Sequence, residues 1–256
     1  MSQAFSLLKF RYHLSFAGVI IGALLFAPNL DAALLWRLVV VYVSFNLLLY
    51  GGIYTFNDIA DRRDDAAHPA KRRRPIASGL VPVRVAIAIS VALVASGLLL
   101  IAWLLPVKVL MASAGALAMN VVYSGGGRNL PFVDILLNSA PHPMRFLIGA
   151  TLVERTPPFG HLLAWLCLAA GVSCVRRIVE KGAPGSSSRS TLAWYSESGL
   201  TAVTDVGLVL LIALAALDRL SSPGFYTVVL IGYFVFVIGA RRPGRLRDAA
   251  GWLWLR

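Results

Sequence analysis

Acidic residues and cysteines are scarce in this sequence. It has 12 Asp and Glu against 24 Lys and Arg, and only 2 cysteines among 256 residues. Cys167 and Cys174 lie in one apolar run without other metal-ligand residues beside them, so we expect small core residues rather than a thiolate metal site. Low-complexity sequence is limited to GAPGSSSRS at 182–190, so no flexible linker separates off a soluble domain.

Hydrophobic residues are abundant instead. They make up 58% of the chain, charged residues make up 14%, and the mean hydropathy is +0.74. These values predict a polytopic membrane protein. A net charge of +12 would suggest nucleic acid in a soluble protein, but in membrane proteins Lys and Arg accumulate in cytoplasmic loops. No basic stripe is interleaved with exposed aromatics, so we expect the bilayer and no nucleic acid as partner.

Eight apolar windows are long enough to be membrane-spanning segments. They lie near 13–30, 36–56, 81–104, 107–123, 131–152, 159–176, 202–218 and 223–240. Backbone groups in lipid must be satisfied internally, and no alternating strand pattern indicates a barrel, so the segments are predicted helices. The predicted fold is an all-α transmembrane bundle forming a single integral membrane domain over 1–256, with eight spans, or nine if the C-terminal AAGWLWLR is part of another.

The N-terminal stretch KFRYHLSFAGVIIGALLFAPNLDAA imitates a signal peptide. Because further spans follow at once, we expect an uncleaved first helix. Most bases lie at the N-terminus and in the connections after the second, fourth, sixth and eighth spans. The positive-inside rule therefore predicts an inner-membrane protein with both termini and the segment NDIADRRDD (57–65) on the cytoplasmic side.

The segment NDIADRRDD holds 4 of the 12 acidic residues, directly after the second apolar window. Its metal-ligand candidates are Asn57, Asp58, Asp61 and Asp65, and Asp64 lies next to the last of them. On a helix continuing from that window, Asn57, Asp61 and Asp65 follow at i, i+4 and i+8, with the other two beside them. Like charges at this spacing repel by roughly 0.2–0.5 kcal/mol per exposed pair, so a cation must compensate them.

Two interpretations of the cation remain open. In the first, Arg62 and Arg63 form ion pairs with the aspartates at a solvated helix end. Alternatively, a hard divalent cation such as Mg²⁺ takes oxygen from carboxylates and amides, and from the phosphate of a substrate. The bases that follow could then hold the remaining phosphate oxygens; these are Lys71, Arg72, Arg73 and Arg74.

The pattern N57-D58-x-x-D61-x-x-x-D65, followed by R72-x-R74-P75 and Gly79, resembles the first aspartate-rich motif of the UbiA superfamily of intramembrane prenyltransferases. The resemblance implies an all-helical bundle, usually of nine spans. It also implies Mg²⁺ and a diphosphate bound on the cytoplasmic side, with Asp58 and Asp61 as catalytic residues. The form HPAKRRRPIASGLVP is similar to one branch, the polyprenyl-phosphate (above all decaprenyl-phosphate) phosphoribosyltransferases.

Further positions are similar to that branch over roughly residues 50–200. Between the fourth and fifth windows they are Tyr123, Ser124, Arg128 (where the branch has a lysine), Asp134 and Arg145; after the sixth they are Arg176, Arg177, Glu180, Arg189 and Tyr195. The resemblance implies that these residues, with Asp64 and the bases Lys71, Arg72 and Arg74, bind substrates. The N-terminal segment matches poorly, and the ninth helix is expected to be missing or shortened.

Asp134 and Arg145 lie inside an apolar window, where ionisable side chains are costly and usually face a cavity or each other. The sequence therefore leaves two alternatives: a structural Asp134–Arg145 pair, or contact with substrate. It indicates no oligomeric state.

The resemblance implies Mg²⁺-dependent transfer of 5-phosphoribosyl from phosphoribosyl pyrophosphate to a polyprenyl phosphate, toward lipid-linked arabinose donors for cell-wall arabinan or nodulation signals. Bases after the sixth window suit a donor with two charged ends and an anionic acceptor. One alternative is transfer from a prenyl diphosphate to an aromatic acceptor, which predicts a second acidic D-x-x-x-D motif there. Another is a transporter or assembly protein with an acidic inner gate. A CDP-alcohol phosphotransferase is excluded because its D-G-x-x-A-R core is absent.

Overall fold

The computed structural model describes residues 10–67, 71–182, 190–218 and 222–249, and throughout these ranges the regular elements are helices. The chain divides into two compact units. Unit 1 comprises Met1–Gly125 and Met144–Thr156, and unit 2 comprises Gly126–Pro143 and Pro157–Arg256. The prediction of an all-α fold is confirmed, and the prediction of a single domain stays a prediction.

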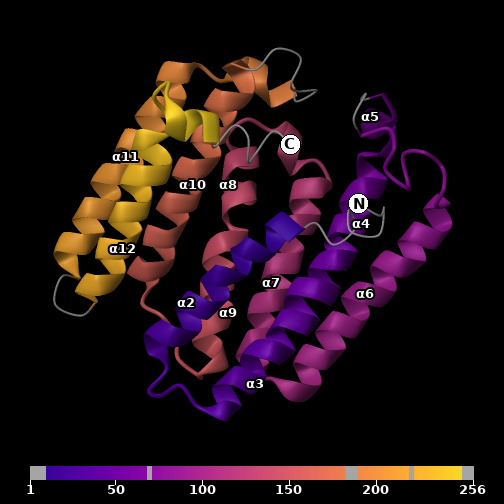
Figure 1. Cartoon of the computed structure of the whole chain (residues 1–256), viewed down its shortest axis with the longest axis horizontal. Coiled ribbons are helices and arrows are strands. Elements are labelled where there is room, and N and C mark those ends of the chain that lie inside the picture. The colour runs from indigo at the N-terminus through magenta and orange to yellow at the C-terminus, as the bar shows by residue number, and fades with distance from the viewer. Residues whose placement is uncertain (1–9, 68–70, 183–189, 219–221, 250–256) are drawn as a thin grey trace. The chain divides into compact units, whose positions relative to one another are not determined.

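Unit 1 is organised around one long helix that carries the acidic segment at its end. Its elements are η1 (Phe10–Phe16), α2 (Ala17–Phe26), α3 (Ala32–Val41), the π-helical η2 (Tyr42–Leu49), α4 (Tyr50–Ala60), α5 (Arg62–Ala67), α6 (Val83–Leu104) and α7 (Val107–Ser124). α3, η2 and α4 join into 29 continuous helical residues. Asp31 caps the start of this helix, because its Oδ1 accepts the N–H of Leu34 at 2.7 Å. α6 packs along the second half of the helix (Figure 1).

Glycines let the helices of unit 1 approach closely. A Cβ at Gly52 would lie 2.7 Å from the backbone oxygen of Ser90 on α6, and Ser90 Oγ donates to the Gly52 carbonyl at 2.8 Å. A Cβ at Gly97 would lie 2.6 Å from the backbone oxygen of Ser44. These contacts place α6 against the long helix and so fix the helix that ends in the acidic segment.

Unit 2 is built from the helices that follow, and its three longer ones lie side by side (Figure 1). Its elements are η3 (Gly127–Asn129), α8 (Val133–Ser139), α10 (Phe159–Gly182), η4 (Ser190–Trp194), α11 (Glu197–Leu217), α12 (Pro223–Tyr233) and the π-helical η5 (Phe234–Gly239). α9 (Pro141–Leu152) begins in unit 2 and continues in unit 1. Cys167 and Cys174 are buried, free residues of α10, as predicted.

All eight apolar windows are wholly or mostly helical, and five helices in the described ranges are long and apolar enough to cross a membrane. These five are Ala32–Ala60, Val83–Leu104, Val107–Ser124, Phe159–Gly182 and Glu197–Leu217. The predicted span 131–152 is divided at Ala140 into α8 and α9, while His13–Phe26 and Pro223–Gly239 are shorter apolar helices. The total of eight or nine spans therefore stays a prediction. The proposed C-terminal stub lies almost entirely outside the described residues.

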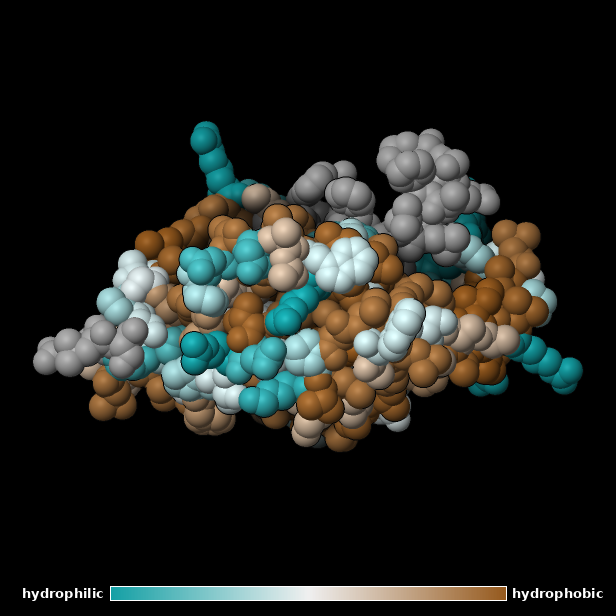
Figure 2. Space-filling model, turned by 90° about the horizontal axis from the view of Figure 1, so that it is seen from below, coloured by the Kyte–Doolittle hydropathy of each residue, from teal (hydrophilic) through white to brown (hydrophobic). Residues whose placement is uncertain are grey.

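Large apolar side chains remain exposed on the helices. Trp103 of α6 is 81% exposed and Leu217 at the end of α11 is 86% exposed. Hydrophobic residues also cover much of the face in Figure 2, where hydrophilic residues interrupt them. Such a surface suits lipid rather than water, and with the five long apolar helices it makes the chain a multi-pass membrane protein.

Candidate active site

The acidic segment keeps its helical spacing across a one-residue break. α4 ends at Ala60, Asp61 has φ −86° and ψ −2°, and α5 begins at Arg62. The backbone N–H of Asp61 donates to the Asn57 carbonyl at 2.9 Å, and that of Asp65 donates to the Asp61 carbonyl at 2.8 Å. The predicted continuation of the helix is therefore confirmed in its hydrogen bonding, with an interruption that the sequence pattern did not indicate.

One arginine nitrogen joins two carboxylates of this segment. Nη1 of Arg74 donates to Oδ1 of Asp58 at 3.1 Å and to Oδ2 of Asp65 at 2.8 Å. Nζ of Lys71 lies 3.8 Å from Oδ1 of Asp65. We call Asp58, Asp65, Lys71 and Arg74 the acidic-loop cluster. The Asp65 side chain is only 4% exposed, whereas the Arg74 side chain is 36% exposed.

The sequence left open that Arg62 and Arg63 compensate the aspartates. In the structure, the loop bases Lys71 and Arg74 neutralise Asp58 and Asp65. Nη1 of Arg62 donates instead to the backbone oxygen of Ile59 at 3.3 Å. The difference arises because residues 71–79 fold as consecutive turns, with the N–H of Arg74 donating to the Lys71 carbonyl at 2.9 Å. These turns place Arg74 where its side chain reaches two aspartates.

Other predicted site residues of unit 1 lie around the same helix end. Oγ of Ser124, the last residue of α7, donates to Oδ1 of Asn57. Tyr123 and Asp61 are half-buried, while Asp64 and Arg72 are exposed. The structure thus brings Asn57, Asp58, Asp65, Lys71, Arg74 and Ser124 into one linked region.

The donor set of this region suits a hard cation only in hydrated form. In the described ranges, no group of three His, Cys, Asp or Glu residues is placed to hold a metal ion by itself. Mg²⁺ does not need three, because it commonly takes one or two carboxylates, several waters and substrate phosphate oxygens. Asp58 and Asp65 already converge on a single cationic nitrogen, so these residues fit such an ion.

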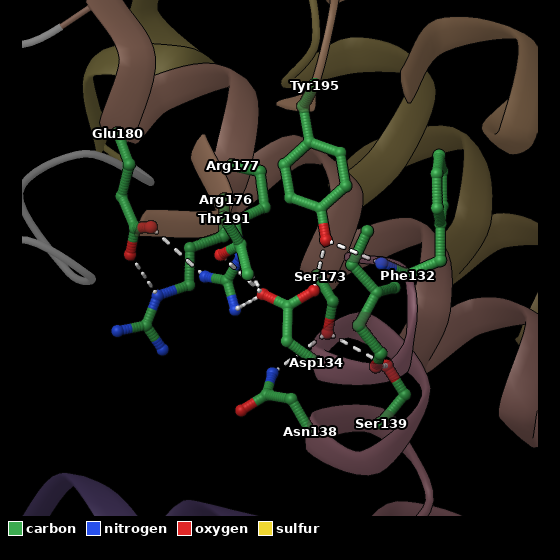
Figure 3. Close-up of polar contacts among 11 residues, drawn as sticks. Phe132, Asp134, Asn138, Ser139, Ser173, Arg176, Arg177, Glu180, Thr191 and Tyr195 are labelled. Atoms are coloured by element: carbon green, nitrogen blue, oxygen red, sulfur yellow. Dashed lines mark hydrogen bonds and ion pairs between the residues drawn. The ribbon is translucent and has the colours of Figure 1, made fainter. Parts of the chain in front are cut away.

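A second group of charged residues is entirely buried in unit 2 (Figure 3). Asp134 of α8 and Arg177 of α10 are both 0% exposed. Nε and Nη2 of Arg177 lie 3.0 Å from Oδ2 of Asp134. The Tyr195 hydroxyl donates to Oδ1 of Asp134, and Thr191 Oγ1 lies 3.4 Å from Oδ2. The Asp134 carboxylate therefore has three partner residues from two other segments of unit 2, α10 and residues 190–195.

The ion pairs continue along α10. Nη1 of Arg177 donates to Oε2 of Glu180 at 3.0 Å, and Nε of Arg176 donates to Oε1 of the same carboxylate at 2.9 Å. The Arg176 side chain is 34% exposed, and its terminal nitrogens point away from the group (Figure 3). We call Asp134, Arg177, Glu180, Thr191 and Tyr195 the buried cluster, with Arg176 at its edge.

Tyr195 closes the buried cluster against the turn before α8. Its hydroxyl accepts the backbone N–H of Phe132 at 2.8 Å while donating to Asp134. Phe132 has φ +64°, a left-handed conformation that costs a non-glycine residue energy, so this hydrogen bond helps to hold the turn. Burial, and next the hydrogen bond to Asp134, raise the pKa of Tyr195 to about 12.

Arg177, rather than Arg145, is the arginine ion-paired with Asp134, which corrects the structural alternative expected from the sequence. Arg145 is almost fully buried, with its guanidinium carbon 4.2 Å from the ring centroid of Tyr50. Nδ2 of Asn120 donates to the Tyr50 hydroxyl at 3.3 Å. Arg145 therefore makes a cation–π contact in unit 1.

Some predicted site residues are not joined to these groups by the contacts above, and some contacting residues were missed. Arg128 is a half-buried residue of η3, and Arg189 lies outside the described residues. Thr191 and Phe132 were not predicted. Tertiary proximity brings both into the network, and no local sequence signal indicated it.

The sequence matches the model of the UbiA prenyltransferase family over residues 15–255. It is 28% identical over 206 residues to decaprenyl-phosphate phosphoribosyltransferase of Mycobacterium tuberculosis, covering 77% of this chain and 67% of the relative. It is 33% identical over 135 residues to the enzyme of the same name from Corynebacterium glutamicum, covering 51% of this chain and 41% of the relative. The matched stretches thus represent about two-fifths to two-thirds of these relatives.

The fold is also similar to that of a UbiA homologue from Archaeoglobus fulgidus bound to DMAPP and Mg²⁺. The TM-score is 0.77 at 16% sequence identity, covering 99% of this chain and 96% of that one. The likeness in fold agrees with the family match, which covers nearly all of the sequence. The chain therefore belongs to the UbiA prenyltransferase family and is a membrane-embedded transferase.

Proposed function

We propose that this transferase moves the 5-phosphoribosyl group from phosphoribosyl pyrophosphate to a polyprenyl phosphate and releases diphosphate. The observation that carries the proposal is the character of the α10 end. Arg176, Arg177, Glu180 and Lys181 lie there, and the sequence has no aspartate between Asp134 and Asp205. The relatives from M. tuberculosis and C. glutamicum, both named decaprenyl-phosphate phosphoribosyltransferase, support the same chemistry.

In this proposal the acidic segment holds the donor diphosphate. Asn57, Asp58, Asp61 and Asp65 are the proposed Mg²⁺ ligands, with Asp58 and Asp61 the catalytic pair. When bound, Mg²⁺ supplies charge neutralisation for the leaving diphosphate. Lys71, Arg72 and Arg74 bind diphosphate oxygens that the metal leaves free, since guanidinium groups can form two parallel bonds to phosphate.

The acceptor phosphate attacks C1 of the ribose. A bond forms between C1 and the acceptor phosphate oxygen, and the bond from C1 to the diphosphate oxygen breaks with its electron pair leaving on diphosphate. The acceptor is already an anion, so no general base is required. The chain's own residues contribute positioning and electrostatic stabilisation, with Arg145 or Arg128 as the proposed contact for the acceptor phosphate.

Nine further residues are proposed to bind substrates. They are Asp64, Tyr123, Ser124, Asp134, Arg176, Arg177, Glu180, Arg189 and Tyr195. The terminal nitrogens of Arg176 point away from the buried cluster (Figure 3), which suits contact with a phosphate group of a substrate. The buried members keep Glu180, and through it Arg176, in place. The proposed setting is the inner membrane with the site facing the cytoplasm, in the synthesis of lipid-linked arabinose donors.

A second candidate is transfer of a prenyl group from a prenyl diphosphate to an aromatic acceptor. The A. fulgidus homologue bound to DMAPP and Mg²⁺ favours it, since that protein shares the fold. This second function would require an aspartate-rich motif after the sixth apolar window. The sequence has Arg176, Arg177 and Glu180 there instead. Membership of a transferase family leaves no support for the transporter alternative.

The test is a turnover assay of the purified full chain in lipid nanodiscs. With Mg²⁺, phosphoribosyl pyrophosphate and a long-chain polyprenyl phosphate, we expect diphosphate release and a phosphoribosylated lipid. Prenylation of 4-hydroxybenzoate from a prenyl diphosphate, with no phosphoribosylated lipid, would establish the second candidate instead. Asp58→Asn and Asp61→Asn should abolish turnover, whereas Glu154→Gln, which removes an exposed carboxylate two residues after α9, should retain it.

A further inference from the structure

The position of Arg74 has a consequence for how the metal site is loaded. One of its nitrogens, Nη1, lies 3.1 Å from an oxygen of Asp58 and 2.8 Å from an oxygen of Asp65. A single positive group thus occupies the point on which these two proposed metal ligands converge. The arginine and a metal ion compete for the same carboxylate oxygens.

Formal charges show why the competition matters. Asp58 and Asp65 carry two negative charges, which Arg74 and Lys71 balance. A divalent cation added alone leaves the acidic-loop cluster with two excess positive charges, and this is unfavourable where the membrane surface lowers the dielectric. A diphosphate brings roughly two to three negative charges. The cation and the diphosphate together therefore bring the cluster close to neutrality.

Because Arg74 lies in a loop, its side chain can move away from the two aspartates. Its side chain is 36% exposed, and it belongs to the turns of residues 71–79 rather than to a helix. Its backbone is held locally, with the N–H donating to the Lys71 carbonyl and its own carbonyl accepting from Ser78 at 2.9 Å. Rotation of the side chain can therefore release both carboxylates while the turn stays folded.

We propose that Arg74 is a placeholder cation, which occupies the ion position between Asp58 and Asp65 until a diphosphate binds. Its side chain then rotates to form an ion pair with the diphosphate, and this frees the two carboxylates for the metal. The exchange makes binding of the metal and the diphosphate mutually dependent. Arg74 also gives Asp65, which is nearly buried, a second cation beside Lys71 in the empty state. The inference rests on the proposed metal site but not on the identity of the group attached to the diphosphate.

Equilibrium binding of Mn²⁺ tests the proposal without turnover. Free Mn²⁺ is measured by electron paramagnetic resonance as it is added to the full chain in nanodiscs, with and without inorganic diphosphate. Protein-free titrations provide the correction for the Mn²⁺–diphosphate complex. For Arg74→Gln we expect Mn²⁺ alone to bind roughly five- to fifty-fold more tightly than in the wild type, and diphosphate to raise the affinity correspondingly less.

Two variants make the result specific. Arg63→Gln removes an exposed charge two residues from Asp65 and should change the affinity for Mn²⁺ alone by less than about threefold. Arg74→Lys keeps a cation that can reach the carboxylates and should bind Mn²⁺ alone like the wild type; its thermal unfolding also tests whether the site tolerates substitution. If Arg74→Gln does not fold, tighter Mn²⁺ binding by Arg74→Lys than by the wild type overturns the placeholder role.

The outcomes separate this inference from the proposed function. Equal affinity of Arg74→Gln and wild type for Mn²⁺ alone overturns the placeholder role even if phosphoribosyl transfer is observed. A strong increase supports it even if the transferred group proves to be prenyl. No binding of Mn²⁺ by the wild type with diphosphate present overturns both the placeholder and the proposed metal site.

Discussion

The two units each contain an arginine between two carboxylates, and the two arginines differ in burial. Arg74 joins Asp58 and Asp65 with a side chain that is 36% exposed. Arg177 joins Asp134 and Glu180 with a side chain that is 0% exposed. The chemistry of the pairs is the same, but only the first arginine is exposed to water.

The difference in burial assigns the clusters different roles. A partly exposed ion pair contributes about 0–1 kcal/mol, so its partners can be exchanged at small cost. A buried charge left without its partner costs about 3–5 kcal/mol. The acidic-loop cluster is therefore suited to exchanging one cation for another, and the buried cluster to holding α8, α10 and the segment at Tyr195 in fixed positions.

The largest loss of stability is expected for Arg177→Met, which places an unbranched apolar side chain in the same space. It leaves the fully buried Asp134 without its ion pair, so we expect the free energy of unfolding to fall by about 3–5 kcal/mol. Reversible denaturant unfolding in mixed micelles measures it. Arg176→Met is the matched control, since it removes the other arginine on Glu180 from a more exposed position; equal losses in the two variants would contradict the distinction by burial.

A smaller loss is expected for Tyr195→Phe. The Phe132 N–H and an oxygen of Asp134 lose their partner, and we expect the variant to be less stable by about 1–3 kcal/mol at neutral pH. The pKa of Tyr195 is raised from 10 to about 12, so the neutral hydroxyl is favoured in the folded state. Its stabilising contribution is fully present below pH 10 and is lost as the pH rises through 12.

The pH dependence gives Tyr195→Phe its diagnostic outcome. The stability difference between wild type and variant should shrink as the pH rises from about 10 toward 12, measured by unfolding at a series of pH values. Subtracting the variant removes the titration of the other tyrosines, which both proteins share. A difference that stays constant over this range would show that the Tyr195 hydroxyl is not coupled to folding.

The sequence predicted one cluster better than the other for a physical reason. Asn57, Asp58, Asp61 and Asp65 are close in sequence, so the helical period alone places them near one another. Asp134 and Arg177 are 43 residues apart, and only tertiary packing decides that Asp134 pairs with Arg177. Hydropathy predicted the helical segments because each depends on its own residues. It could not predict the division at Ala140, which separates α8 from α9.

The smallest effect on stability is expected for Arg74→Gln, at below about 1 kcal/mol in the same unfolding assay. Asp65 keeps Lys71 within 3.8 Å, and the exposure of Arg74 leaves room for water to replace the lost guanidinium. The same substitution is expected to change metal binding strongly. A variant of near-wild-type stability with altered metal affinity would separate the exchangeable cluster from the fixed one, because removing one charged partner from the buried cluster is expected to cause a large loss of stability. If Arg74→Gln instead lost as much stability as Arg177→Met, Arg74 would be a structural cation and the two clusters would be alike.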